Sequence, residues 1–237
     1  MDHAAALLDQ AAQLADLTAS ADPDAPVPTC PGWTVAQLLR HTGRGHRWAA
    51  TIVRTGEFVN PRDVPGGKPE GDVGEWLRGS AQVVIDAVAE VGADVPVWTF
   101  LGPRPAGWWI ARRLHEATVH RADAAIALGI GYELDPALAV DGIDEWLGLL
   151  AHRRADEGPA GLDPGVTLHL HATDTDGEWL IRGGDPVITW ERGHAKGDAA
   201  VRGRAVDLFL GAMRRTDAVE VLGDAAVWRT WLERTHF

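Results

Sequence analysis

The sequence predicts an α+β protein, with a helical bundle at the N-terminus and a smaller α+β domain after it. Apolar residues recur every three or four positions in the N-terminal part of the chain, which is the period of amphipathic helices. From Gly165 onward the period changes to two, which is the period of β-strands. With 237 residues and 46% hydrophobic content, the chain can bury a core in each part.

Four amphipathic segments are expected to pack as a four-helix bundle. Stretches rich in proline and glycine separate them, and these residues interrupt helices and favour turns. Four helices of about twenty residues joined in this way are typical of a bundle. The expected helices cover residues 3–19, 34–54, 73–91 and 108–128.

The second of these helices carries two informative features. Thr34 and Gln37 have the spacing of a capping box, which places the start of the helix at Thr34. Gly43 and Gly45 lie inside the helix and weaken it by about 1 kcal/mol each relative to alanine. Glycines at such positions indicate close approach by a ligand or by another helix.

The C-terminal part reads as strands followed by alternating short elements. A fifth helix is expected over residues 134–154 and is assigned to the first domain, which then covers residues 1–155. The second domain covers residues 156–237, and the first three of its strands are expected to be antiparallel. The expected strands are residues 166–171, 179–181, 187–190, 199–201 and 219–222, with helices at 205–213 and 224–232.

Charge and cysteine content exclude several classes of function. The net charge of −12, without a dense stretch of Lys and Arg, argues against a nucleic-acid partner. The chain shows neither a basic leader nor an apolar run that could cross a bilayer, so no membrane partner and a cytoplasmic location are expected. The single cysteine, Cys30, excludes an internal disulfide and is expected to be a packing residue. The oligomeric state is left open between monomer and dimer.

A metal site is suggested by the fourth helix. Glu116 and His120 are four positions apart, so they project from one helix face within about 40° of each other and can hold one ion together. His115 makes the pattern His-Glu-x-x-x-His, one residue longer than the zinc-peptidase pattern. Because His115 and His120 lie about 140° apart around the helix, a zinc-peptidase arrangement is excluded.

The third ligand has two candidates on the second helix, His41 and His46. His41 is favoured because it follows two leucines and precedes small residues, whereas His46 lies at a more polar position. Two histidines and one glutamate, with a fourth position open, form a recognised catalytic zinc set. Asp123, three residues after His120, is placed to accept the free imidazole N–H.

Two stretches of the sequence resemble the mycothiol-dependent maleylpyruvate isomerase family. They are Val-Pro-Thr-Cys-Pro-Gly-Trp-Thr-Val at residues 27–35, leading to His41, and Arg-Arg-Leu-His-Glu-Ala-Thr-Val-His-Arg-Ala-Asp at residues 112–123. The segment around residues 199–210 is similar to that family's C-terminal domain. The resemblance implies a DinB-like four-helix bundle followed by a sterol-carrier-like domain.

The resemblance also implies a site and a chemistry. It implies a zinc ion held by His41, Glu116 and His120, which takes the thiolate of mycothiol at its open position. It further implies an arginine of the C-terminal domain near the substrate carboxylate; Arg202 fits best, with Arg112 and Arg113 as alternatives by local charge.

Three functions follow from these features. The leading hypothesis is a zinc-dependent enzyme that uses mycothiol on a small electrophile, either as an S-transferase or as a cis–trans isomerase of the maleylpyruvate type. The second keeps the metal and activates water to hydrolyse an amide or ester. The third is a small-molecule binding protein in which the many tryptophans line an apolar pocket.

Overall fold

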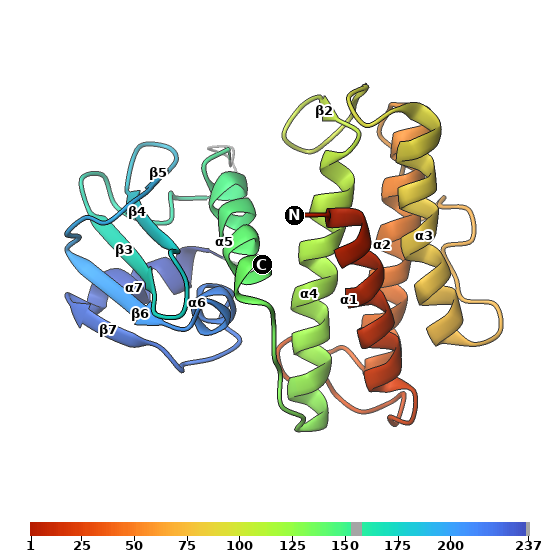
Figure 1. Ribbon diagram of the computed structural model, residues 1–237, viewed down its shortest axis with the longest axis horizontal. Coiled ribbons are helices and arrows are strands. Elements are labelled where there is room, and N and C mark those ends of the chain that lie inside the picture. Colours follow the sequence, from red (N-terminus) through yellow and green to blue (C-terminus); the bar gives the residue numbers. More distant parts are fainter. Residues whose placement is uncertain (153–157, 236–237) are drawn as a thin grey trace. The chain divides into compact units, whose positions relative to one another are not determined.

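Four long helices form the first unit of the protein, which extends from Met1 to Tyr132 and confirms the predicted bundle (Figure 1). The computed structural model describes residues 1–152 and 158–235. Helix α2 packs chiefly on α3, and α1 packs on both α4 and α3. The helices are α1 (His3–Thr18), α2 (Val35–Thr55), α3 (Val73–Val91) and α4 (Trp108–Leu128).

The ends of these helices are set by side chains that satisfy free backbone groups. Thr34 and Gln37 form the predicted capping box at the start of α2. The carboxylate of Asp72 accepts from the backbone N–H of Glu75 at the start of α3. Gly56 caps the C-terminal end of α2, and its φ of 74° is the left-handed conformation that favours glycine.

Both glycines inside α2 allow a neighbouring helix to approach. A β-carbon at Gly43 would overlap the indole ring of Trp76 in α3. A β-carbon at Gly45 would lie 2.6 Å from the guanidinium of Arg113 in α4. The prediction of close approach at these glycines is confirmed, and the second contact brings a cation into the bundle.

The bundle core is apolar, and its largest side chains come from all four helices. Between α3 and α4, where the sequence indicated a loop, β1 (Pro96–Val97) pairs with β2 (Arg104–Pro105) in a short antiparallel ladder. Across the described parts of the chain, no helix combines the length and the apolar composition needed to cross a lipid bilayer. The fully buried core residues of the bundle include Leu7, Leu14, Leu38, Leu77, Trp109 and Leu114.

The second unit, Glu133–Phe237, is a five-stranded sheet with helices, in the order β5-β4-β3-β6-β7 (Figure 1). Strand β4 pairs antiparallel with β3 and with β5, as expected. Strand β7 pairs antiparallel with β6. The central pair, β3 with β6, is parallel, and the sequence carried no prediction for this pair. The elements are α5 (Pro136–Leu150), β3 (Thr167–Ala172), β4 (Glu178–Arg182), β5 (Thr189–Arg192), β6 (Ala199–Gly203), α6 (Ala205–Ala212), β7 (Glu220–Gly223) and α7 (Ala225–Arg234).

The two faces of this sheet differ in chemistry. Leu168, Leu170 and Trp179 are buried on one face, and the indole N–H of Trp179 donates to Asp144 of α5 at 2.8 Å. Side chains alternate between the faces of a strand, so His169 and His171 point to the opposite face. That second face is therefore rich in ionisable groups.

The division between the two units differs from the expected one. The expected boundary between residues 155 and 156 lies outside the described residues, whereas the compact units meet between Tyr132 and Glu133. The reason is that α5 packs with α6: a β-carbon at Gly142 of α5 would overlap the ring of Phe209. Helix α5 is thus part of the sheet-containing unit and not a fifth helix of the bundle.

The α5–α6 contact makes a stability prediction. We expect Gly142→Ala to lower the free energy of unfolding by about 1–3 kcal/mol, because the added methyl group overpacks the contact with Phe209. Gly148→Ala in the same helix is the matched control, since its β-carbon would meet no atom within 4 Å and should stabilise the helix slightly. Urea unfolding of both variants measures the difference. Equal stability of the two variants would contradict this packing.

Candidate metal centre

His41, Glu116 and His120 converge in the bundle, as the sequence predicted. The Nε2 atom of His41 lies 3.0 Å from Oε1 of Glu116. The Nε2 atom of His120 lies 4.0 Å from the same oxygen, and the two imidazole rings are 5.1 Å apart at 88°. One ligand atom from each residue therefore lies within 4.8 Å of the other two.

The carboxylate of Glu116 is held ionised by its neighbours. Its second oxygen, Oε2, accepts from Arg113 at 2.6 Å and from Arg112 at 3.3 Å. Burial alone would raise the pKa of Glu116, but Arg113, the hydrogen bond from His41 and Arg112 outweigh it and hold the pKa well below the usual range. Oε1 is thus a charged oxygen that faces both histidines.

The ring of His120 is oriented from its other side. Its Nδ1 atom lies 2.9 Å from Oδ2 of Asp123, which confirms the predicted contact. Burial lowers the pKa of His120 and outweighs the opposing effect of Asp123, so the neutral imidazole is favoured. Since Nδ1–H donates to Asp123, Nε2 keeps its lone pair and points toward Glu116.

Cys30 contacts the same carboxylate, which sequence reasoning missed. Its Sγ–H donates to Oδ2 of Asp123 at 3.4 Å, while the side chain also packs against the apolar core. The signal was present, because Cys30 and Trp33 belong to the stretch that leads to His41. The Trp33 ring lies 4.6 Å from that of His41 and 6.1 Å from that of His120. The loop before α2 thus covers one side of the centre.

The geometry of the three residues fits a small divalent cation. Two ligands at about 2.1 Å from a tetrahedral zinc ion are separated by about 3.4 Å. The separations of 3.0 Å and 4.0 Å from Glu116 Oε1 to the two histidine nitrogens bracket that value. Two imidazoles and one carboxylate are also a donor set that zinc accepts.

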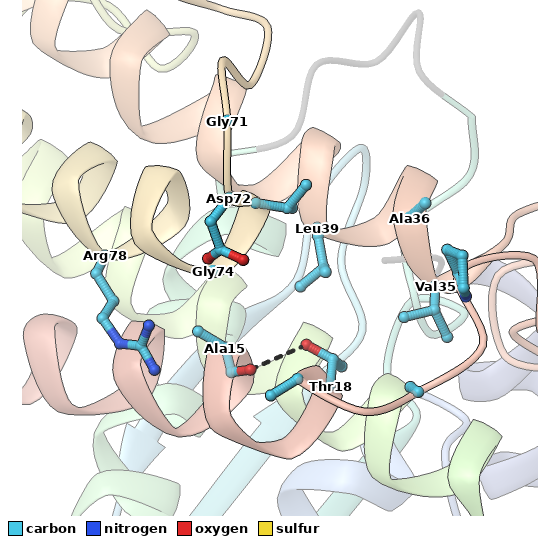
Figure 2. A pocket seen from close by; sticks show the side chains of 13 residues that line it. Ala15, Thr18, Val35, Ala36, Leu39, Gly71, Asp72, Gly74 and Arg78 are labelled. Carbon is cyan, nitrogen blue, oxygen red and sulfur yellow. Dashed lines mark hydrogen bonds between the residues drawn. The ribbon is translucent and has the colours of Figure 1, made fainter.

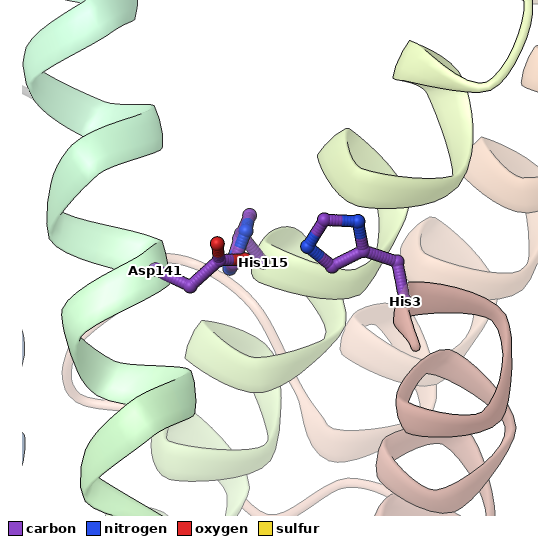
Figure 3. A group of neighbouring side chains, drawn as sticks. All are labelled: His3, His115 and Asp141. Atoms are coloured by element: carbon purple, nitrogen blue, oxygen red, sulfur yellow. The ribbon is translucent and has the colours of Figure 1, made fainter. Parts of the chain in front are cut away.

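His115 does not join this centre, as the helical geometry predicted. Figure 3 labels His115 in α4 and His3 in α1, and their rings lie 6.2 Å apart at 74°. The ring of His120 faces His41 instead. The two histidines of α4 therefore belong to different surroundings, and the zinc-peptidase arrangement is absent from the described residues.

His46 is buried, contrary to its expected polar position. Its side chain is fully inaccessible, and neither ring nitrogen has a hydrogen-bond partner among the described residues. Burial, reinforced by the nearby charge of Arg113, lowers the pKa of His46 well below its ordinary value. His41, and not His46, lies in the group with Glu116 and His120, in agreement with the choice made from the sequence. What separates the two histidines is the position of the ring nitrogen of His41 beside Glu116, and not the polarity of the neighbouring residues. The proximity of Arg113 in α4 to this residue could not be foreseen from the segment around His46.

A cationic pocket of about 560 Å³ opens beside His41. Its charged residues are Arg40, Arg44 and Lys68, and no ion pair engages them within the described parts of the chain. Arg40 and Arg44 are four positions apart on α2, so they share one helix face next to His41. Sequence analysis missed this grouping because Lys68 comes from the loop before α3. The pocket suits an anionic ligand.

A second pocket, of about 370 Å³, lies between the C-terminal end of α1 and the N-terminal ends of α2 and α3 (Figure 2). The hydroxyl of Thr18 donates to the backbone oxygen of Ala15. Asp72 caps α3, and Arg78 pairs with Asp16 and Glu75. Its polar groups are thus occupied by contacts within the bundle.

The arginines that were expected near a substrate occupy different places. Arg112 and Arg113 are buried and form ion pairs with Glu116, so their positive charge stabilises its ionised carboxylate. Arg202 is exposed on β6 and lies opposite His171 in the β3–β6 register. Arg202 therefore stays a predicted substrate ligand, while the other two arginines have a defined role at Glu116.

Family models assign both units. The model of the mycothiol maleylpyruvate isomerase N-terminal domain matches residues 4–125, and that of the corresponding C-terminal domain matches residues 137–230. The chain belongs to the mycothiol-dependent maleylpyruvate isomerase family. By that membership it is an enzyme of an isomerase family, and the C-terminal match includes α5, in agreement with the observed division into units.

Solved structures and curated sequences agree with this assignment. The crystal structure of the mycothiol-dependent maleylpyruvate isomerase matches with a TM-score of 0.62 and 14% identity, over 93% of this chain and 91% of that chain. A variant of that isomerase gives a TM-score of 0.60. The uncharacterized proteins MT0763 and Rv0738 of Mycobacterium tuberculosis are each 30% identical over 140 residues, which is 57% of this chain and 68% of theirs. The structural likeness at this identity establishes the shared α+β fold.

Burial of His46 makes the metal-free protein sensitive to acid. The folded-state pKa of His46 lies well below the ordinary histidine value of about 6.5, so below that pH the unfolded chain binds more protons than the folded one. Stability is therefore lost as pH falls from neutrality through this range, by at most about 1.4 kcal/mol per pH unit for this residue. We expect His46→Gln to show a shallower loss in chelator-treated protein.

The measurement is urea unfolding at several pH values between neutrality and mild acid. His152→Gln, at an exposed position after α5, is the control for removal of a histidine. An unchanged pH slope in His46→Gln would show that His46 does not carry this proton linkage.

Proposed function

We propose that this protein is a zinc-dependent enzyme that uses mycothiol to transform a small anionic electrophile, by cis–trans isomerisation or by S-transfer. The observation that carries the proposal is the convergence of His41 Nε2, His120 Nε2 and Glu116 Oε1 beside a cationic pocket. Membership in the isomerase family supports the thiol and the small-molecule substrate.

His41, Glu116 and His120 would hold the ion through their three converging atoms. When bound, zinc would supply a Lewis acid that keeps the mycothiol sulfur as a nucleophilic thiolate at neutral pH. Arg113 and Arg112 keep Glu116 ionised and fix its second oxygen, so that the first is free to act as a ligand.

Asp123 prepares His120 for the same task. By accepting from Nδ1–H, it fixes the tautomer that presents Nε2 and limits rotation of the ring. Asp123 is fully buried, so its hold on His120 is shielded from competing water. The ring of Trp33 packs beside His41, with the ring centroids 4.6 Å apart.

The pocket beside His41 would bind the anionic part of the substrate. Arg40 and Arg44 offer guanidinium groups that can grip a carboxylate through two parallel hydrogen bonds, and Lys68 adds a third positive charge. Arg202 of the second unit stays proposed as a further carboxylate ligand, by the family resemblance alone. A substrate with two carboxylates would use more than one of these cations.

Loss of one ligand tests the metal site. We expect His120→Ala to lower the bound zinc by one equivalent per chain and to abolish mycothiol-dependent turnover, because two ligands do not retain the ion. Elemental analysis after dialysis gives the metal content, and conversion of maleylpyruvate, with and without mycothiol, gives the activity. His152→Ala is the surface control and should retain both.

The same assay separates the reaction types. An isomerase regenerates mycothiol, whereas an S-transferase consumes it in proportion to the product. Unchanged zinc content and unchanged turnover in His120→Ala would overturn the proposed centre. Equal turnover with and without thiol would contradict thiol chemistry and favour the hydrolase hypothesis.

Loss of a pocket cation tests the substrate site. We expect Arg44→Gln to raise KM for the anionic substrate by about five- to thirtyfold with kcat little changed, because it removes a contact made equally before and during the reaction. Zinc content should not change. Arg54→Gln, whose partner Glu90 lies outside the pocket, is the matched control on the same helix. A KM equal to that of the control would place the anion elsewhere.

A further inference from the structure

In the second unit, three histidines surround one carboxylate on the face of the sheet that carries His169 and His171. His169 and His171 lie two residues apart on β3, so their side chains share one face of the sheet. Glu178 of β4 is directly opposite His171 in the register. His194 follows β5, and the ring centroids of the three histidines are 5.4–6.3 Å apart.

The backbone at the end of β5 brings His194 over this face. The N–H of Gly193 donates to the carbonyl of Glu178 at 3.1 Å, which extends the β4–β5 pairing by one residue. Gly193 has a φ of 140°, in the region that side chains other than glycine rarely adopt. The chain can therefore turn immediately after this pairing, and the imidazole of His194 reaches Glu178.

The two oxygens of Glu178 have separate partners. Oε2 lies 2.9 Å from Nδ1 of His194 and 3.6 Å from Nε2 of His169. Oε1 lies 2.7 Å from Nδ1 of His171. One oxygen is thus shared by two histidines, while the third histidine holds the carboxylate in place through the other oxygen.

The distance between His169 and Glu178 is too long for a hydrogen bond and matches two ligands of one ion. A nitrogen–oxygen separation of 3.6 Å exceeds hydrogen-bond length, whereas ligands of one tetrahedral zinc ion are about 3.4 Å apart. His169 is only 4% exposed, and its Nε2 has no hydrogen-bond partner among the described residues. A buried imidazole nitrogen aimed at a carboxylate in this way needs a ligand to satisfy it.

We propose that the second unit holds its own divalent transition-metal site, with His169 Nε2, Glu178 Oε2 and His194 Nδ1 as ligands. One atom from each lies within 4.8 Å of the other two. Imidazole and carboxylate ligands suit zinc and its neighbours in the first transition series. The proton shared between His194 and Glu178 leaves for solvent when the ion binds.

His171 is a positioning residue in this site. Its hydrogen bond to Oε1 sets the angle at which Oε2 faces His169 and His194. The ion would add a side-chain connection between β3, β4 and the segment after β5 to their backbone hydrogen bonds. The site is independent of the centre in the bundle, since it shares no residue with it.

The test uses the full chain with the first centre disabled by His120→Ala. In this background we expect one equivalent of Zn²⁺ per chain by calorimetry, a cobalt visible spectrum typical of four- or five-coordinate nitrogen and oxygen ligands, and a higher thermal midpoint with Zn²⁺ than with chelator. Adding Glu178→Gln or His194→Ala should weaken binding by more than about a hundredfold. Adding His171→Ala should weaken it by about ten- to a hundredfold, as expected for a positioning residue.

The control is Glu191→Gln on β5, an exposed carboxylate whose partner is Arg182, and it should leave metal binding unchanged. Because His194 is exposed, its alanine variant should fold, and a wild-type circular dichroism spectrum verifies this. No zinc bound to the His120→Ala chain would overturn the proposal, as would binding that survives Glu178→Gln together with His194→Ala. Failure of the bundle centre would instead leave zinc bound to wild type and to His120→Ala equally.

Discussion

The carboxylate of Glu116, whose side chain is only 12% exposed, is the charge around which the interior of the bundle is arranged. Taking a carboxylate out of water is costly unless charged partners and hydrogen bonds replace the solvent. Arg113, Arg112 and His41 supply them, and each approaches a defined oxygen. The missing side chain of Gly45 in α2 provides the space for the Arg113 guanidinium. A glycine on one helix and an arginine on another are therefore both explained by a single negative charge.

The same constraint orders the residues around the two histidines. The hydrogen bond between Nδ1 and Asp123 gives the ring of His120 one orientation, in which Nε2 lies 4.0 Å from Oε1 of Glu116. The loop before α2 adds Cys30 and Trp33 to the outer side. The two stretches of sequence that resemble the isomerase family thus meet at one place in the fold. Their joint occurrence reflects a single centre, built from a loop and two helices.

The sequence predicted the local structure and the shared helix face of Glu116 and His120 better than the long-range strand pairing. Helical period and caps placed α1 to α4 within about two residues, because these signals are local. Glu116 and His120 were predictable as a pair because four positions on a helix give one face. The parallel pairing of β3 with β6 was not, since alternation identifies a strand but not its neighbour.

The remaining differences come from contacts between distant residues. His46 is buried because Arg113 and the neighbouring helices enclose it, and nothing in its own segment shows this. Lys68 joins Arg40 and Arg44 through the path of a loop, which has no sequence period. The alternation along β3 already placed His169 and His171 on one face. Their proximity to Glu178 could not be predicted, because it depends on the register between β3 and β4.

The place of α5 decides which pieces of this chain could be exchanged between proteins. Trp146 and Leu147 of α5 are buried, and the helix packs with α6 of the sheet unit. A bundle separated after residue 155 would carry this helix without its partner and would expose its apolar face to water. A junction at Tyr132 keeps each apolar face with the surface it covers. Recombination, whether in evolution or in protein engineering, should therefore succeed at the linker before α5 and fail after it.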